Sequence, residues 1–176
     1  MDDVTIEPFD LADRAEEALA VQALAFGLTD EEIAVRLQIV TRHAGYPGVI
    51  ALGAMRGRRL VGFGYGMPND RAHWWSTVIQ PYLEAGGNGH WLDDSFAVTE
   101  LHVLPACQGR GLGTALITGL CGRSGLPRSI LSAVDAETPA RRLYRALGYA
   151  DLARAVMFPN TDRPYAVMGA VLPLRG

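Results

Sequence analysis

Three glycines within five positions, Gly109, Gly111 and Gly113, stand between a strand-like segment and a helical pattern. Residues 96–103 are rich in β-branched and aromatic side chains, which indicates a strand. After the loop, small and apolar residues recur at helical spacing, at Leu112, Ala115, Leu116, Gly119 and Leu120. A helix N-terminus presents unpaired N–H groups and the positive end of its dipole, and glycine lets a ligand approach the backbone. The junction is therefore expected to bind a phosphate group.

Two common phosphate-binding loops do not fit this segment. A Walker loop ends in Gly-Lys-Ser/Thr, but all 16 basic residues of the chain are arginine, which also excludes Schiff-base chemistry on lysine. The dinucleotide motif G-x-G-x-x-G fails because Thr114 stands where its last glycine falls. In that motif an acid that binds the ribose stands about 20 residues after the glycines, and Asp135 lies somewhat farther from them than that. A dinucleotide oxidoreductase is therefore the last of the alternatives.

A third loop type fits. The run Gln108-Gly109-Arg110-Gly111-Leu112-Gly113 resembles the Gln/Arg-x-x-Gly-x-Gly/Ala signature of the GNAT N-acetyltransferases. Glu100 to Pro105 resembles the fourth strand of that family. Residues 140–149 resemble a later helix of the family, which ends in Leu-Tyr-x-x-Leu-Gly-Phe/Tyr. Together the similar segments extend over roughly residues 96–152, the half of the chain expected to bind the cofactor.

The resemblance implies an α/β (α+β) fold with a mixed, mostly antiparallel sheet of about six to seven strands flanked by helices. Two neighbouring parallel strands, here 96–103 and 129–134, would splay apart around the pantetheine arm of acetyl-CoA. The N–H of Val103 would bind the thioester carbonyl, and the backbone of Gly109 to Thr114 the diphosphate. The predicted cofactor-binding set is Leu101, His102, Val103, Gln108, Gly109, Arg110, Gly111, Leu112, Gly113 and Thr114.

Acyl transfer to an amine requires a base, because an alkylammonium group has a pKa of about 10.4. Glu100 is the first candidate, since strand alternation puts it on one face with His102 and Leu104, opposite Leu101 and Val103. His102 is the second, because imidazole titrates near neutrality. The structural alternatives are a Glu100 held by an arginine at a sheet end and a hydrogen-bonded structural histidine.

The departing thiolate requires a proton, and the resemblance assigns its donation to Tyr144. The alternative is a core tyrosine whose hydroxyl reaches the rim. Arg110, Arg141 and Arg142 are interpreted either as ligands of the cofactor phosphates or as solvated surface residues.

Two other chemistries are set aside. Cys107 borders the phosphate loop, but no histidine stands at a recognisable spacing to activate it as an acyl carrier. The residues His73, His90, Asp93 and Asp94 are scattered over a polar segment, and no metal site is predicted.

Local signals locate the elements that must position these residues. Residues 15–26 predict one helix, and Thr29 with Glu32 forms a capping-box pattern at the start of a second. Hairpins are predicted at 49–67 and 150–172, and Thr138 with Pro139 begins a helix. The alternating Gly62, Gly64 and Gly66 indicate either close approach of a ligand or a bulged or twisted strand, and the second is favoured.

The segment 68–95 holds all three tryptophans and is predicted to be an insert. One interpretation is an aromatic lid over the acceptor, and the other, which helical spacing at Trp75, Val78, Ile79 and Tyr82 favours, is a packed satellite core. The acceptor is expected to meet this insert, the turn 27–30 and the loop 159–164.

Bulk properties indicate one domain over residues 1–176. A net charge of −3 disfavours nucleic acid, the apolar stretches are too short for a bilayer, and two cysteines make no disulfide framework, so a cytoplasmic protein is expected. We predict an acetyl-CoA-dependent N-acetyltransferase that acts by direct attack in a ternary complex. Its acceptor is the amine of a small molecule or peptide, and the resemblance also allows a homodimer. The alternative is a catalytically silent acyl-CoA-binding or regulatory module.

Overall fold

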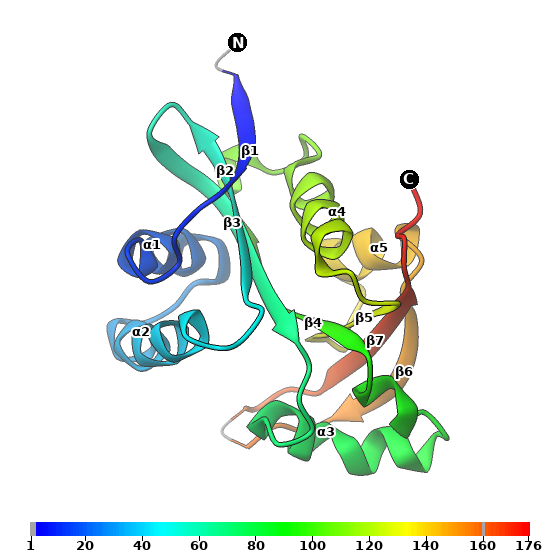
Figure 1. Cartoon of the computed structure of the whole chain (residues 1–176). Helices are drawn as coiled ribbons and strands as arrows, with labels where there is room; N and C mark the ends of the chain where they lie inside the picture. Colours follow the sequence, from blue (N-terminus) through cyan, green and yellow to red (C-terminus); the bar gives the residue numbers. More distant parts are fainter. Residues whose placement is uncertain (1–2, 160) are drawn as a thin grey trace. The chain divides into compact units, whose positions relative to one another are not determined.

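The computed structural model describes residues 3–159 and 161–176, and these contain seven strands, five α-helices and two short 3-10 helices (Figure 1). The N-terminal elements are β1 (Val4–Pro8), α1 (Ala15–Phe26), α2 (Asp30–Ala44), β2 (Ile50–Arg56), β3 (Arg59–Pro68), α3 (Trp74–Ala85) and η1 (Gly89–Leu92). The C-terminal elements are β4 (Ser95–Val103), η2 (Pro105–Cys107), α4 (Leu112–Ser124), β5 (Arg128–Val134), α5 (Pro139–Ala146), β6 (Ala150–Val156) and β7 (Tyr165–Val171).

The strands are hydrogen-bonded in the order β1-β2-β3-β4-β5-β7-β6. The pairs β1–β2, β2–β3, β5–β7 and β6–β7 are antiparallel, and β4–β5 is parallel. The predicted mixed, mostly antiparallel sheet is therefore confirmed. The parallel ladder joins Ser95 to Arg128, Phe96 to Ser129 and Ala97 to Ile130, whereas β4 continues to Val103.

By its contacts the chain divides into two compact units. Unit 1 comprises the residues up to Met67 together with Val98–Arg123, and unit 2 comprises Pro68–Ala97 and Ser124–Gly176. Strand β4 contributes residues to both. A single domain with an insert at 68–95 stays a prediction.

In unit 1, α1 and α2 cover one face of β1–β3 and α4 covers the other (Figure 1). Side chains of α1 and α2, such as Leu19 and Val40, pack with Phe63 and Tyr65 of β3 in a buried core. On the opposite face, a Cβ at Gly64 would lie 3.0 Å from Leu120 Cδ1 and 3.2 Å from the backbone oxygen of Glu100. Gly62 and Gly64 thus permit close packing of β4 and α4 against β3. The β2–β3 register also shifts between Ala54 and Met55, opposite Gly62 and Leu60, which agrees with the favoured bulged or twisted strand.

The predicted connection between α1 and α2 is confirmed. Helix α1 ends at Gly27, which adopts φ 74°, and Thr29 begins the capping box of α2. Thr29 Oγ1 accepts the N–H of Glu32 at 3.2 Å, and the Glu32 carboxylate accepts the N–H of Thr29 at 3.0 Å. These local bonds satisfy backbone donors that the helix leaves unpaired.

In unit 2, α3 and α5 lie on opposite faces of β5–β7 (Figure 1). Ile79 and Leu83 of α3 pack with Ile130 and Val167 in a second core, to which Trp75 and Trp91 also belong. Trp75 Nε1 donates to Ser132 Oγ at 3.3 Å. Packing therefore explains two of the three tryptophans, whereas Trp74 is 60% exposed. Across the described residues, every helix is too short or too polar to cross a membrane.

Candidate active site

The glycine loop leads from the end of β4 through η2 into α4, all within unit 1. Gly109 and Gly111 adopt φ 73° and 78°, a left-handed conformation that strains any residue with a Cβ. Residues 108–111 are exposed, and a Cβ added at either glycine would meet no atom within 4 Å. An accessible turn at the N-terminus of a 13-residue helix is the kind of site at which backbone N–H groups bind anions.

The end of β4 has a defined backbone orientation. Leu104 N–H donates to Val61 O of β3 at 2.9 Å. Because successive N–H groups of a strand point to opposite edges, the N–H of Val103 points away from β3. Gln108 Nε2 donates to Val103 O at 3.0 Å and so ties the loop to the strand. Gln108, predicted to bind the cofactor, therefore also holds the residue proposed to bind the thioester.

Glu100 and His102 lie on one face of β4, as strand alternation predicted. His102 Nε2 lies 2.6 Å from Glu100 Oε2, and the side chains are 11% and 20% exposed. The side chains of Leu101 and Val103 approach Gly64 and Gly62 on the opposite face, where α4 packs. Glu100 and His102 consequently form a pair on the face that α1 and α2 cover.

Side chains of α1, α2 and β3, all in unit 1, surround the pair. The His102 ring centroid is 5.9 Å from that of Phe26 at the end of α1 and 5.6 Å from that of Phe63 of β3. Arg36 Nη1 of α2 lies 3.6 Å from Glu100 Oε1, so each carboxylate oxygen of Glu100 faces a basic group. On the same helix, His43 Nδ1 lies 2.9 Å from the hydroxyl of Tyr65.

These contacts perturb two acids. Burial opposes ionisation of Glu100, but the hydrogen bond with His102 and the charges of His102, Arg36 and His43 outweigh it and lower the pKa of the carboxyl. Glu100 is thus held as a carboxylate. Burial and the negative charge of Glu100 raise the pKa of Tyr65, which stays protonated at physiological pH.

Arg36, His43 and Tyr65 are neighbours of the Glu100–His102 pair that the sequence alone did not predict. A signal was present for the first two, which lie seven residues apart on the inner face of α2 that Ile33, Leu37 and Val40 define. A charged residue that interrupts the buried face of an amphipathic helix requires a partner. No comparable signal marks Tyr65, because a buried tyrosine in a strand is ordinary core.

Tyr144 is the one predicted site residue that belongs to unit 2. It lies on the inner face of α5 and is 8% exposed. Its ring packs edge-to-face on Tyr149 with centroids 5.7 Å apart, and the Tyr149 hydroxyl lies 2.7 Å from Ser129 Oγ of β5. The phenol is therefore held by a short helix and a buried neighbour.

Both interpretations of Arg141 are wrong. The side chain is fully buried, and its guanidinium contacts Asp135 Oδ1 at 3.3 Å and Asp151 Oδ2 at 2.9 Å. It is neither solvated nor available to a cofactor phosphate. The same contacts count against the dinucleotide alternative, because the Asp135 carboxylate also binds Arg154 and the N–H of Ala155. Arg110 and Arg142 are exposed.

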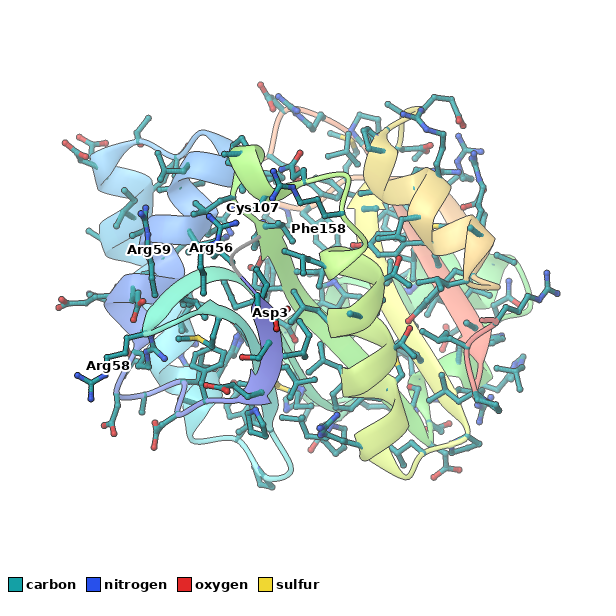
Figure 2. The ribbon with its side chains drawn as sticks, turned by 90° about the horizontal axis from the view of Figure 1, so that it is seen from above. Asp3, Arg56, Arg58, Arg59, Cys107 and Phe158 are labelled. Carbon is teal, nitrogen blue, oxygen red and sulfur yellow. The ribbon has the colours of Figure 1, made fainter. Side chains whose placement is uncertain are left out.

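Cys107 is buried at 3% exposure, and its sulfur accepts from Arg56 Nη2 at 3.6 Å (Figure 2). Its burial is that of a structural thiol. In the part of the chain that the structure describes, no three histidine, cysteine or acidic side chains gather as metal ligands. Asp93, one of the residues considered for a metal, pairs with Arg71 at 2.7 Å.

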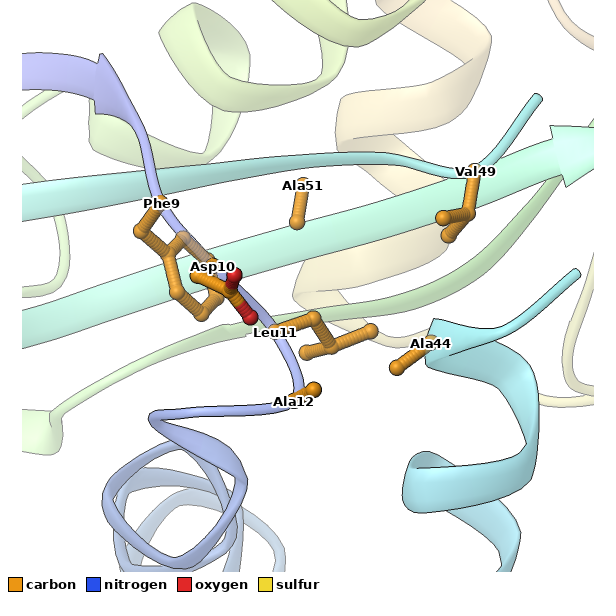
Figure 3. Close-up of a pocket in the computed structure, with 7 residues that line it drawn as sticks. All are labelled: Phe9, Asp10, Leu11, Ala12, Ala44, Val49 and Ala51. Carbon is orange, nitrogen blue, oxygen red and sulfur yellow. The ribbon is translucent and has the colours of Figure 1, made fainter.

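A pocket of about 190 Å³ opens between the β1–α1 connection, the end of α2 and the start of β2 (Figure 3). Its lining residues are Phe9, Asp10, Leu11, Ala12, Ala44, Val49 and Ala51, and none of them is a predicted site residue. Asp10 Oδ1 accepts the N–H of Asp13 at 3.0 Å, which is a local turn contact.

Comparisons with known proteins agree with this geometry. A family model described as an acetyltransferase (GNAT) domain matches residues 50–151, which include Glu100, the glycine loop and Tyr144. A GCN5-like protein acetyltransferase of Mycobacterium tuberculosis is 34% identical over 123 residues, or 65% of this chain. The match spans 60% of that relative's length.

Solved structures share the fold. The ribosomal-protein-S18-alanine N-acetyltransferase of Escherichia coli aligns with a TM-score of 0.69 at 17% identity, over 99% of this chain and 97% of that chain. The PaiA N-acetyltransferase of Thermoplasma acidophilum, solved in complex with coenzyme A, aligns with a TM-score of 0.63 at 12% identity, over 95% and 99%. At such identities these likenesses support the fold alone.

Proposed function

Because this chain belongs to the GNAT family of acetyltransferases, we propose that it transfers the acetyl group of acetyl-CoA to a primary amine by direct attack in a ternary complex. The observation that carries the proposal is the exposed left-handed turn at Gly109 and Gly111, which leads into α4 within the segment that matches the family. The chemistry that acetyl-CoA supplies is an activated acyl thioester.

The backbone from Gly109 to Thr114 is proposed to bind the diphosphate through its N–H groups. Leu101, His102 and Val103 follow the pantetheine arm, and the N–H of Val103 donates to the thioester oxygen. Its direction away from β3 and the tie from Gln108 to the same residue support this assignment. A preorganised donor of this kind contributes about 2.7 to 4 kcal/mol to transition-state stabilisation.

We assign the proton transfer from the amine to the Glu100–His102 pair. The depressed pKa keeps Glu100 ionised at neutral pH, and an ionised carboxylate in contact with an imidazole stabilises the imidazolium that forms when the pair takes a proton. Phe26 and Phe63 flank the imidazole and limit its contact with water. Tyr144 is proposed to give its phenolic proton to the departing thiolate.

The acceptor is proposed to be a small-molecule or peptide amine. Two relatives are named for protein acceptors, the mycobacterial protein acetyltransferase and the enzyme that acts on an alanine of ribosomal protein S18. The test panel therefore pairs each free amine with a peptide that presents the same amine at its N-terminus. Thiol release that depends on both acetyl-CoA and amine is the expected result. Tight binding of acetyl-CoA with no thiol release across the panel would reject the transferase proposal in favour of a catalytically silent acyl-CoA-binding module.

The loop assignment has its own matched test. Gly111→Ala and Gly125→Ala both place a Cβ at a left-handed residue, with φ 78° and 68°, where no atom lies within 4 Å. The backbone strain is therefore similar, but Gly125 follows the C-terminal end of α4. Calorimetric titration should show weaker acetyl-CoA binding for Gly111→Ala alone. Equal affinities for the two variants would reject the loop as the phosphate site.

A further inference from the structure

We propose that Arg141 is a positioning residue for Tyr144, and that its ion pairs with Asp135 and Asp151 hold the phenol in the orientation that proton transfer requires. The inference rests on the proposed function, because it takes Tyr144 as the acid. It gives Arg141 a role other than the phosphate binding considered from the sequence. All four side chains belong to unit 2.

The network joins the end of one strand to a helix and to a second strand. Asp135 follows β5, Arg141 lies in α5 and Asp151 lies in β6. The guanidinium donates from Nη1 to Asp135 Oδ1 at 3.3 Å and from Nη2 to Asp151 Oδ2 at 2.9 Å. The planar fork of arginine matches two acceptors in a way that a lysine ammonium cannot.

The burial of this charge makes both contacts obligatory. Arg141 is fully buried, and its Nε has no hydrogen-bond partner in the described part of the chain. Loss of one partner of a buried ion pair leaves a buried charge without compensation, which strongly destabilises the folded state. The two ion pairs therefore hold the guanidinium in place, and through it they hold α5 against the strands that carry the two carboxylates.

Tyr144 stands one turn after Arg141 on the same inner face of α5. The helix has eight residues, which is too short for stability without tertiary contacts. Thr138 Oγ1 caps it by accepting the N–H of Arg141 at 3.2 Å, so the same residue carries the cap and the buried charge. Arg141 thus influences the orientation of Tyr144 through the helix that carries both residues.

The second strand is fixed by the same carboxylate. Asp135 accepts Arg154 Nε at 2.6 Å and the N–H of Ala155 at 2.8 Å. Ala155 adopts φ 52° at an irregularity of β6, a conformation that an L-residue adopts only when its surroundings impose it. Asp135 therefore sets the position of β6, and with it that of Asp151, the other partner of Arg141.

A double-mutant cycle tests whether Arg141 acts through Tyr144. Purified wild type, Tyr144→Phe, Arg141→Lys and the double variant are assayed with acetyl-CoA and the best amine of the panel. Tyr144→Phe is expected to lower kcat about 100-fold. Arg141→Lys keeps the charge but not the fork, and misorientation of the phenol should lower kcat about 10- to 100-fold with KM for acetyl-CoA within about twofold. In the Tyr144→Phe background, Arg141→Lys should have no further effect on kcat.

Several outcomes overturn the proposal. An equal loss of kcat from Arg141→Lys in both backgrounds would mean that Arg141 does not act through the phenol. A lower melting temperature with unchanged kcat would leave it a purely structural role. Full activity of Tyr144→Phe would reject both the proposed acid and this inference. If Tyr144→Phe and Arg141→Lys each lower kcat and their effects multiply in the double variant, only this inference is rejected.

Two further variants keep the test valid. If Arg141→Lys does not fold, Asp151→Asn removes one arm of the network at a side chain that is 28% exposed, and the same cycle is run with it. Arg145→Lys is the matched control, because Arg145 lies on the same helix α5 with an exposed side chain that pairs with Glu137. Its kcat should equal that of wild type in both backgrounds.

Discussion

His102 Nε2 lies 2.6 Å from Glu100 Oε2, and the other oxygen of the same carboxylate faces Arg36 at 3.6 Å. The two candidate bases that the sequence offers are thus one hydrogen-bonded unit. Because the two side chains share one hydrogen bond, a change in either removes the same contact, so their effects on transfer cannot be additive.

The first prediction follows from this coupling. Glu100→Gln and His102→Gln should each lower kcat/KM by about 100- to 1,000-fold, because either change removes the pair as a proton acceptor. The double variant should be no worse than the poorer single variant. Steady-state thiol release at pH 7.5 measures all three, with the exposed His90→Gln as the control. Multiplicative losses would show that the two residues act separately.

A second prediction concerns Arg36 and pH. Its positive charge helps to lower the pKa of Glu100, so Arg36→Gln should raise that pKa. Activity that requires the carboxylate form then begins to fall at a higher pH when the solution is acidified. Profiles of kcat against pH for wild type and variant measure the shift. Arg42→Gln, an exposed change on the same helix, should leave the profile in place.

Acid stability provides the third prediction. The pKa of Glu100 is lower in the folded state than the ordinary value of 4.5, so the folded state binds its proton less readily than the unfolded chain. The stabilisation from ionised Glu100 is complete above pH 4.5 and is lost as the pH falls through the folded pKa. Urea unfolding across this range should show wild type losing more stability than Glu100→Gln. Parallel curves for the two proteins would contradict the lowered pKa.

Gly64 and Gly122 give a fourth, purely structural prediction. A Cβ at Gly64 meets Leu120, Leu101 and the backbone oxygen of Glu100 at 3.0 to 3.2 Å, so Gly64→Ala should destabilise the protein by about 1 to 3 kcal/mol. A Cβ at Gly122 of α4 meets nothing within 4 Å. Gly122→Ala should be neutral or more stable by up to about 1 kcal/mol, since alanine favours the helix. Free energies of unfolding in urea decide between these signs.

The fifth prediction separates direct transfer from an acyl-enzyme. Cys107 is buried beside Arg56, so Cys107→Ala should keep thiol release within about twofold of wild type, as direct transfer requires. Intact-protein mass spectrometry after incubation with acetyl-CoA alone should find no acetylated Cys107. A large loss of activity together with an acetylated thiol would replace the ternary-complex proposal.

Much of the fold was predictable because its signals are local. The helix at 15–26, the capping box of Thr29 and Glu32, and the start of α5 at Pro139 were all correctly predicted from the residues within each element. The shared face of Glu100 and His102 was predictable for the same reason, since alternation along a strand needs no partner. Arg141 was misinterpreted because its partners at 135 and 151 come together only when β5, α5 and β6 pack.

By itself, the sequence determined the type of most helices and strands, the glycine turn before α4 and the family to which the chain belongs, because these depend on neighbours a few residues apart. Only the tertiary structure decided that Arg36, His43 and Tyr65 surround the Glu100–His102 pair and that Arg141 is a buried charge. Burial and proximity are properties of packed surfaces. The side chains that set the protonation of Glu100 and the orientation of Tyr144 therefore became apparent only when distant segments packed together.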